Sequence, residues 1–86
     1  MPGVSEKETK IMTILLDSVE KVKKFVDLAA KIPCDIDLKS GRYTVDAKSI
    51  MGIFSLDLKK PLTLVVFSPE YEDKTNIFAE FEYKEE

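Results

Sequence analysis

The sequence contains no histidine and only one cysteine, Cys34, among its 86 residues. A single cysteine cannot form a disulfide within the chain, and it excludes a C-x-x-C redox or zinc motif. Without histidine, imidazole ligation of zinc and histidine acid–base catalysis are excluded as well. We therefore expect no metal site and no cofactor. Since no nucleophile–base pair is visible either, we do not expect an enzyme.

Long apolar runs and a concentrated basic surface are also missing. No stretch approaches the roughly 20 apolar residues that cross a bilayer, and the polar segment 1–10 lacks the apolar core of a signal peptide. The net charge of −3 disfavours nucleic-acid binding, which normally requires a basic face. We therefore expect a cytoplasmic protein that neither inserts into a membrane nor binds nucleic acid directly.

The composition is typical of one small globular domain. Hydrophobic residues make up 44% of the chain and charged residues 34%, and 86 residues allow a single core. We expect residues 1–9 to form a flexible lead-in and residues 10–86 to form the domain. A monomer or a weak dimer is expected.

The hydrophobic pattern predicts seven elements in the order strand, helix, strand, strand, helix, strand, helix. Asp17 and Ser18 supply N-cap chemistry for the first helix, and Asp17 with Glu20 fits the spacing of a capping box. Ser40, Gly41 and Arg42 predict a tight turn between the second and third strands. The expected strands are residues 10–16, 34–38, 43–47 and 62–67, and the expected helices begin after Ser18, at Ser49 and at Asp73. This order predicts a two-layer α+β sandwich with helices on one face of an antiparallel sheet, and it leaves the strand order open.

Apolar positions at helical spacing predict which helix residues face the core. In the last helix they are Ile77, Phe78 and Phe81. Gly52 inside the short second helix predicts a close packing contact, because glycine is otherwise unfavourable there. The stripe expected for the first helix consists of Val19, Val22, Phe25, Val26, Ala29 and Ala30.

The most specific motif lies in the segment VDAKSIMGIFSL, residues 45–56. Its centre, KSIMG, followed by Ser55 and Leu56, resembles the regulatory segment of HPr, the phosphocarrier of the bacterial sugar phosphotransferase system. Length and element order are similar to those of this family. The resemblance implies the HPr fold, in which three helices cover one face of a four-stranded antiparallel sheet (βαββαβα). It also implies protein partners.

The phosphate-carrying positions of the family are changed in this chain. An ungapped alignment from KSIMG puts the histidine that receives phosphate from enzyme I at Ser18. The arginine and proline that follow that histidine in the family fall on Glu20 and Lys21. A serine phosphoester is not labile enough to be passed on, so histidine-linked phosphotransfer is excluded. Ser18 is most simply a helix cap.

The serine of the regulatory segment is kept, at Ser49. The resemblance implies phosphorylation of this serine by HPr kinase and ATP. A phosphate at a helix start is electrostatically favourable, although a serine before a helix is more commonly only an N-cap. The resemblance also implies that the partner-binding surface includes Lys48, Ile50, Met51 and Phe54. Apolar residues at helical spacing belong to the core more often than to an interface.

Two functions are compatible with these residues. The first is a regulatory binding protein, an HPr paralogue that is switched by phosphorylation of Ser49 and read by a transcription regulator or a metabolic enzyme. The family includes a precedent, a catabolite-repression form that lacks the histidine and keeps the serine. The second is an unmodified docking or decoy domain that binds the partners of HPr through its apolar patch.

Overall fold

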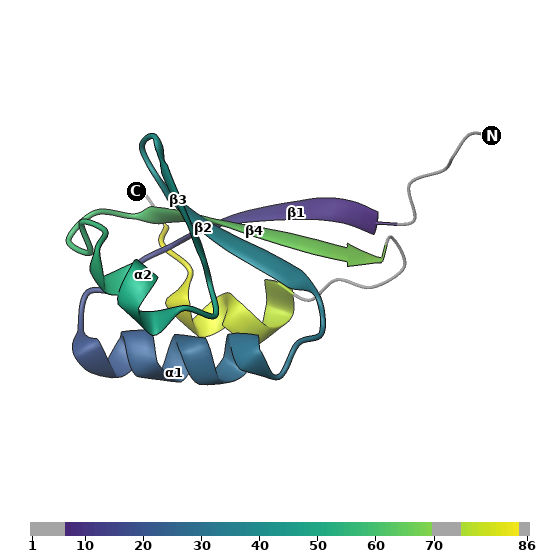
Figure 1. Ribbon diagram of the computed structural model, residues 1–86, viewed down its shortest axis with the longest axis horizontal. Helices are drawn as coiled ribbons and strands as arrows, with labels where there is room; N and C mark the ends of the chain where they lie inside the picture. Colours follow the sequence, from purple (N-terminus) through teal and green to yellow (C-terminus); the bar gives the residue numbers. More distant parts are fainter. Residues whose placement is uncertain (1–6, 70–74, 85–86) are drawn as a thin grey trace.

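A computed structural model describes residues 7–69 and 75–84 and contains one antiparallel sheet with helices on one of its faces (Figure 1). The strand order is β1-β4-β2-β3, and each neighbouring pair is antiparallel. The elements are β1 (Lys7–Ile14), α1 (Val19–Ala30), β2 (Asp35–Ser40), β3 (Tyr43–Asp46), α2 (Ile50–Phe54), β4 (Leu62–Pro69) and the 3₁₀ helix η1 (Thr75–Phe81). The predicted two-layer α+β sandwich is confirmed.

The core lies between the sheet and its helices. In β2 the apolar residues Ile36 and Leu38 are buried, while their neighbours Asp35 and Asp37 point to the other face, because side chains alternate along a strand. An aromatic cluster joins α1 to η1. The ring of Phe25 lies 5.0 Å from that of Phe78 and 5.8 Å from that of Phe81, measured between ring centroids.

Helix α1 begins at its expected place, and Ser18 caps it as expected. The side chain of Ser18 accepts a hydrogen bond from the Lys21 backbone N–H at 3.1 Å, so Ser18 is the N-cap. The expected pairing of Asp17 with Glu20 as a capping box is wrong, because Asp17 precedes the cap and its carboxylate pairs with the Lys21 ammonium at 2.9 Å. That hydrogen bond holds the pKa of Asp17 below its ordinary value of 3.8.

Several expected boundaries and faces are corrected. Strand β1 begins at Lys7, so the expected lead-in is wrong for residues 7–9, and residues 1–6 lie outside the described residues. Val19, at the first position of α1, and Ala30, at its last, are exposed rather than buried, because both lie at helix ends. The expected start of the second strand is one residue early, since the buried Cys34 precedes β2.

The expected C-terminal helix is present as a 3₁₀ helix, and the expected positions 73 and 74 lie outside the described residues. Phe78 and Phe81 face the core as expected, but Ile77 is 40% exposed. After η1 the backbone runs along the outer edge of β1. Leu15 N–H donates to Phe81 C=O and Tyr83 N–H donates to Thr13 C=O, both at 2.9 Å, so this segment covers one end of an edge strand.

Candidate functional site

The candidate site is centred on Ser49, the N-cap of α2. Its backbone is extended, and its side-chain oxygen accepts a hydrogen bond from the Gly52 backbone N–H at 3.2 Å. The residue is exposed, so the same hydroxyl that caps the helix is also accessible to an enzyme. The capping role expected for Ser49 is confirmed, and phosphorylation of this residue stays a prediction.

Gly52 allows this cap to sit close to the sheet. A Cβ atom on Gly52 would lie 3.2 Å from Ser49 Oγ and 3.3 Å from Val45 Cβ, tighter than nine in ten real Cβ contacts. The expected close packing at Gly52 is therefore confirmed. Glycine here lets the first turn of α2 rest against β3 while the serine side chain folds back over it.

The apolar side chains of α2 divide between the surface and the core. Ile53 is fully buried and Ile50 is half-buried against the core. Met51 is 77% exposed and Phe54 is 40% exposed. Ile53 thus anchors the helix, while Met51 and Phe54 remain available to a partner, and Ile50 presents only part of its surface.

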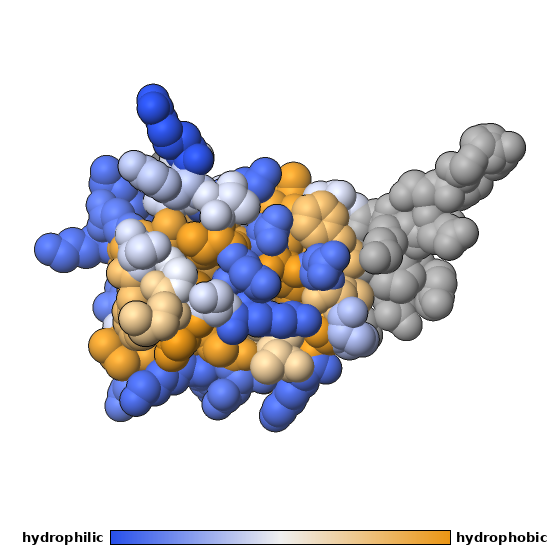
Figure 2. Space-filling model, in the orientation of Figure 1, coloured by the Kyte–Doolittle hydropathy of each residue, from blue (hydrophilic) through white to orange (hydrophobic). Residues whose placement is uncertain are grey.

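A further apolar residue is exposed at the start of α1, the helix that contacts α2. Val19, at the start of α1, is 54% exposed, and Figure 2 shows hydrophobic surface at the end of the molecule where α1 begins and α2 lies. We refer to Val19, Met51 and Phe54 as the helix-side patch. Sequence reasoning missed Val19 because it satisfies the spacing of the buried stripe. Only its position at the first turn of the helix distinguishes it.

Lys48, expected to contact a partner, makes contacts within the protein. Its ammonium donates to the Ile32 carbonyl at 2.7 Å, and its backbone N–H donates to Asp46 Oδ1 at 2.9 Å. Ile32 lies just beyond the C-terminal end of α1, where a positive charge is favourable. Lys48 therefore ties the loop before α2 to the end of α1, and a contact with a partner stays a prediction.

Replacing Lys48 with methionine is expected to lower the free energy of unfolding by about 1–2 kcal/mol, because a hydrogen bond from a charged donor to a carbonyl is lost. Urea denaturation measures this change. The matched control is Lys59→Met, since Lys59 is exposed and no hydrogen bond or ion pair of its ammonium is found within the described residues. Equal stability of the two variants would contradict an anchoring role for Lys48.

Ser18, on which the family's histidine position falls, lies at an acidic helix start. Ser18 Oγ is engaged as a cap. The acidic Asp17 and Glu20 lie on either side of it, and the nearby ammonium of Lys21 is already paired with Asp17. No histidine is present anywhere in the chain. This helix start can therefore cap α1, but it has no imidazole to accept a phosphoryl group.

Comparison with known proteins places this arrangement in a family. The sequence pattern described as "PTS HPr component phosphorylation site" matches residues 19–82, most of the chain. The chain belongs to the HPr family. HPr-family proteins are phosphocarriers that interact with other proteins of the phosphotransferase system, and this chain has a role related to that system.

Two solved HPr structures are similar to the chain over most of its length. HPr-C-His from Thermoanaerobacter tengcongensis is 28% identical, with a TM-score of 0.59, over 81% of this chain and 83% of that one. The phosphocarrier protein HPr from Bacillus anthracis str. Ames is 26% identical, also with a TM-score of 0.59, over 86% of this chain and 90% of that one. The HPr fold implied by KSIMG is thereby confirmed. Within the described ranges, no helix is long and apolar enough to span a membrane.

Proposed function

We propose that this protein is a regulatory member of the HPr family that is switched by ATP-dependent phosphorylation of Ser49. The observation that carries the proposal is the exposure of Ser49 in the same short segment as exposed Met51 and Phe54. The KSIMG motif and family membership make HPr kinase the expected enzyme. Of the two residues that accept phosphate in this family, the histidine is absent from this chain. The serine, Ser49, is therefore the one that remains.

The proposed reaction is a transfer of the γ-phosphoryl group of ATP to Ser49 Oγ. A new O–P bond forms, the bond between the γ-phosphorus and the bridging oxygen of ADP breaks, and the hydroxyl proton passes to a base of the kinase. The product carries about −1.5 to −2 charges and several strong acceptor oxygens. The Gly52 N–H already points at the serine oxygen, so a donor is in place for the new anion.

Phosphorylation would create a surface that combines charge with apolar contact. The phosphate would lie at the start of the helix that carries exposed Met51 and Phe54, so a partner that offers an arginine next to an apolar groove would bind the modified form preferentially. Methionine suits such a contact because its side chain adapts to different surfaces. The proposed partners are a sugar-responsive transcription regulator or a metabolic enzyme.

A second candidate function rests on the same exposed residues without the switch. An unmodified docking or decoy domain would use the helix-side patch alone, and the exposure of Met51 favours that function as much as the first. Under this alternative Ser49 is only a helix cap, and partners bind equally well before and after treatment with the kinase.

Incubation of the purified protein with HPr kinase and ATP tests the proposal. We expect a single added phosphate in the intact mass, mapped to Ser49 and absent from Ser49→Ala. The matched control is Ser55→Ala, because Ser55 is another exposed serine of the same segment, at the C-cap of α2. That variant should be modified to the same extent as the original protein.

The alternative predicts a different result in the same assay. If the protein takes up no phosphate under conditions that modify an ordinary HPr, the switch is refuted and the docking domain becomes the better function. Phosphate that persists in Ser49→Ala and disappears in Ser55→Ala would show that the kinase modifies Ser55. That result would refute the assignment to Ser49. Circular dichroism of each variant checks whether a variant that takes up no phosphate is still folded.

A further inference from the structure

The face of the sheet that the helices leave uncovered has its own pattern of side chains. The strand register aligns Ile11 of β1, Val65 of β4, Asp37 of β2 and Asp46 of β3 in one row across the sheet. In the neighbouring row Phe67 of β4 lies opposite Asp35 of β2. We refer to these residues as the sheet-side patch. It combines an apolar half on β1 and β4 with an acidic half on β2 and β3.

The acidic half contains an unfavourable arrangement. Asp37 and Asp46 lie directly opposite each other on adjacent strands, and like charges in this position destabilise a sheet. No ion pair of Asp35, Asp37 or Asp46 is found among the residues that the structure describes. Three carboxylates therefore concentrate negative charge on one face without a counterion from the described part of the chain.

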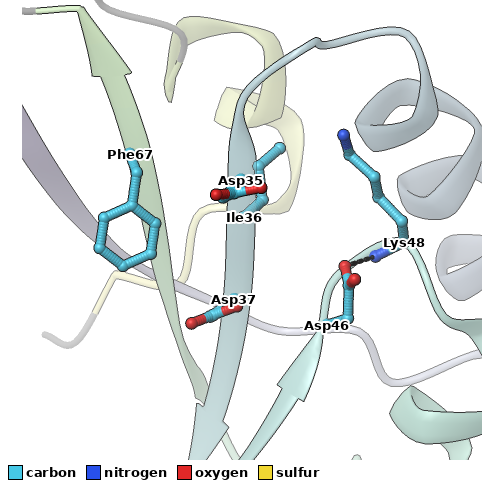
Figure 3. A pocket seen from close by; sticks show the side chains of 6 residues that line it. All are labelled: Asp35, Ile36, Asp37, Asp46, Lys48 and Phe67. Atoms are coloured by element: carbon cyan, nitrogen blue, oxygen red, sulfur yellow. Dashed lines mark hydrogen bonds between the residues drawn. The ribbon is translucent and has the colours of Figure 1, made fainter. Parts of the chain in front are cut away.

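Two lysines lie near these carboxylates without forming an ion pair with them among the described residues. Lys39 belongs to the next row, opposite Thr63 and Thr44, and no ion pair joins it to an aspartate within the described residues. The ammonium of Lys48 is directed to the Ile32 carbonyl. Only the Lys48 backbone N–H reaches the cluster, at Asp46 Oδ1 (Figure 3).

A hollow of about 270 Å³ opens in the sheet-side patch, lined by Asp35, Ile36, Asp37, Asp46, Lys48 and Phe67. Figure 3 shows the phenyl ring of Phe67 on one side of Asp35 and Asp37, with Asp46 on the other side. The carboxylates are not a metal centre, since the described residues include no group of three ligands that could hold a metal ion. The hollow suits a cationic group that also has an apolar or planar surface.

The apolar half of the patch is open to contact. Ile11 is 68% exposed and Phe67 is half-buried, while Val65 between them is nearly covered. Two apolar side chains next to a cation-binding hollow can anchor a short peptide segment rather than a free cation. Since the protein offers negative charge here, charge complementarity selects a basic segment.

We propose that the sheet-side patch binds a segment of a partner protein whose arginine side chain enters the hollow. A guanidinium offers a planar fork of donors that reaches two carboxylates at once, and it stacks on an aromatic ring. Asp37 and Asp46 supply the carboxylates and Phe67 supplies the ring. A lysine ammonium, as a compact charge, satisfies only one part of this arrangement. The proposal does not depend on phosphorylation of Ser49, because it concerns the opposite face of the sheet.

Titration of the ¹⁵N-labelled protein with the peptide acetyl-Val-Arg-Val-amide tests the proposal by NMR. We expect saturable shifts at the backbone amides of Asp37, Asp46 and Phe67, with a Kd on the order of 1 mM for so small a probe. The matched control peptide contains citrulline, which has the shape of arginine without its charge. Asp37→Asn is expected to weaken binding by about tenfold, corresponding to one lost charge-assisted contact.

The same variant provides a second measurement. Because Asp37→Asn removes half of a like-charge pair, its melting temperature should rise by about 2–5 °C. Weak binding together with higher stability indicates that the pair is kept for binding. Equal affinity for the citrulline peptide, or arginine-peptide shifts confined to α1 and α2, would overturn the proposal. So would concentration-dependent shifts on this face without peptide, because a second copy of the chain would then be the occupant.

Discussion

Replacing Phe25 with alanine is expected to lower the free energy of unfolding by about 3–5 kcal/mol, because a large, fully buried ring is removed from the core. Phe25 contacts both Phe78 and Phe81. Its ring therefore fills the space between α1 and η1, and the substitution leaves a cavity there. The total stability expected for a domain of this size is roughly 4–13 kcal/mol, so the loss amounts to about a quarter of it at the least.

Thermal and urea denaturation of two further variants test whether the loss of stability comes from the buried volume of the Phe25 ring. Phe25→Leu keeps most of the buried volume and should lose much less stability than Phe25→Ala. Tyr43→Ala removes an aromatic ring that is 67% exposed, and its stability should change by no more than about 0.5 kcal/mol. A loss below about 1 kcal/mol for Phe25→Ala would mean that η1 does not pack on α1 in solution.

Replacing Met51 with glutamate should lower kcat/KM for phosphorylation of Ser49 by HPr kinase by about tenfold or more. Met51 is the most exposed member of the helix-side patch, and a central apolar contact is commonly worth more than about 1 kcal/mol to binding. The new carboxylate also places negative charge near the serine that must approach ATP. Stability should stay within about 0.5 kcal/mol of the original protein, since the side chain is on the surface.

A matched substitution in the sheet-side patch distinguishes loss of kinase docking from a nonspecific effect of a new surface glutamate. Ile11 is 68% exposed in the sheet-side patch, and Ile11→Glu should leave the kinase reaction unchanged while it alters the arginine-peptide titration. If Met51→Glu and Ile11→Glu slow the kinase equally, the kinase does not dock on the helix-side patch. If Met51→Glu unfolds the protein, Met51 is a core residue and the exposed patch does not exist in solution.

Local signals predict those parts of the fold that local chemistry determines. Ser18 and Ser49 precede apolar helical runs, and both cap their helices through a backbone N–H three residues later. Gly41 adopts a positive φ of 60° in the predicted turn between β2 and β3, where glycine has no steric penalty. These features depend on a few adjacent residues, so a single sequence is enough to locate them.

The errors lie where distant residues decide the structure. Strand β1 extends back to Lys7 because Lys7 pairs with Pro69, and the polar start of that strand has no signal of its own. The C-terminal helix is a 3₁₀ helix that leads directly into the pairing of Phe81 and Tyr83 with β1. Helical periodicity does not distinguish these outcomes, because the partner strand lies at the other end of the chain.

The candidate sites divide in the same way. The KSIMG motif locates Ser49 and Met51 from the sequence alone, because its residues are contiguous. The sequence does not predict the sheet-side patch, although alternation in β2 already places Asp35 and Asp37 on one face. Predicting the Asp37–Asp46 pair requires knowledge of the register between β2 and β3. Predicting that Phe67 lies next to Asp35 requires knowledge that β4 is the neighbour of β2. A single sequence does not reveal which strands are neighbours.

The pairing of β1 with β4 also determines the order of events during synthesis. Ile14 pairs with Leu62, far along the chain, and a ribosome adds about 5–20 residues per second. For several seconds β1 has therefore been made while its partner has not, and the apolar Ile11, Met12 and Ile14 have no strand beside them. The sheet closes only when β4 emerges, so until then the apolar side chains of the first strand lack their native neighbours.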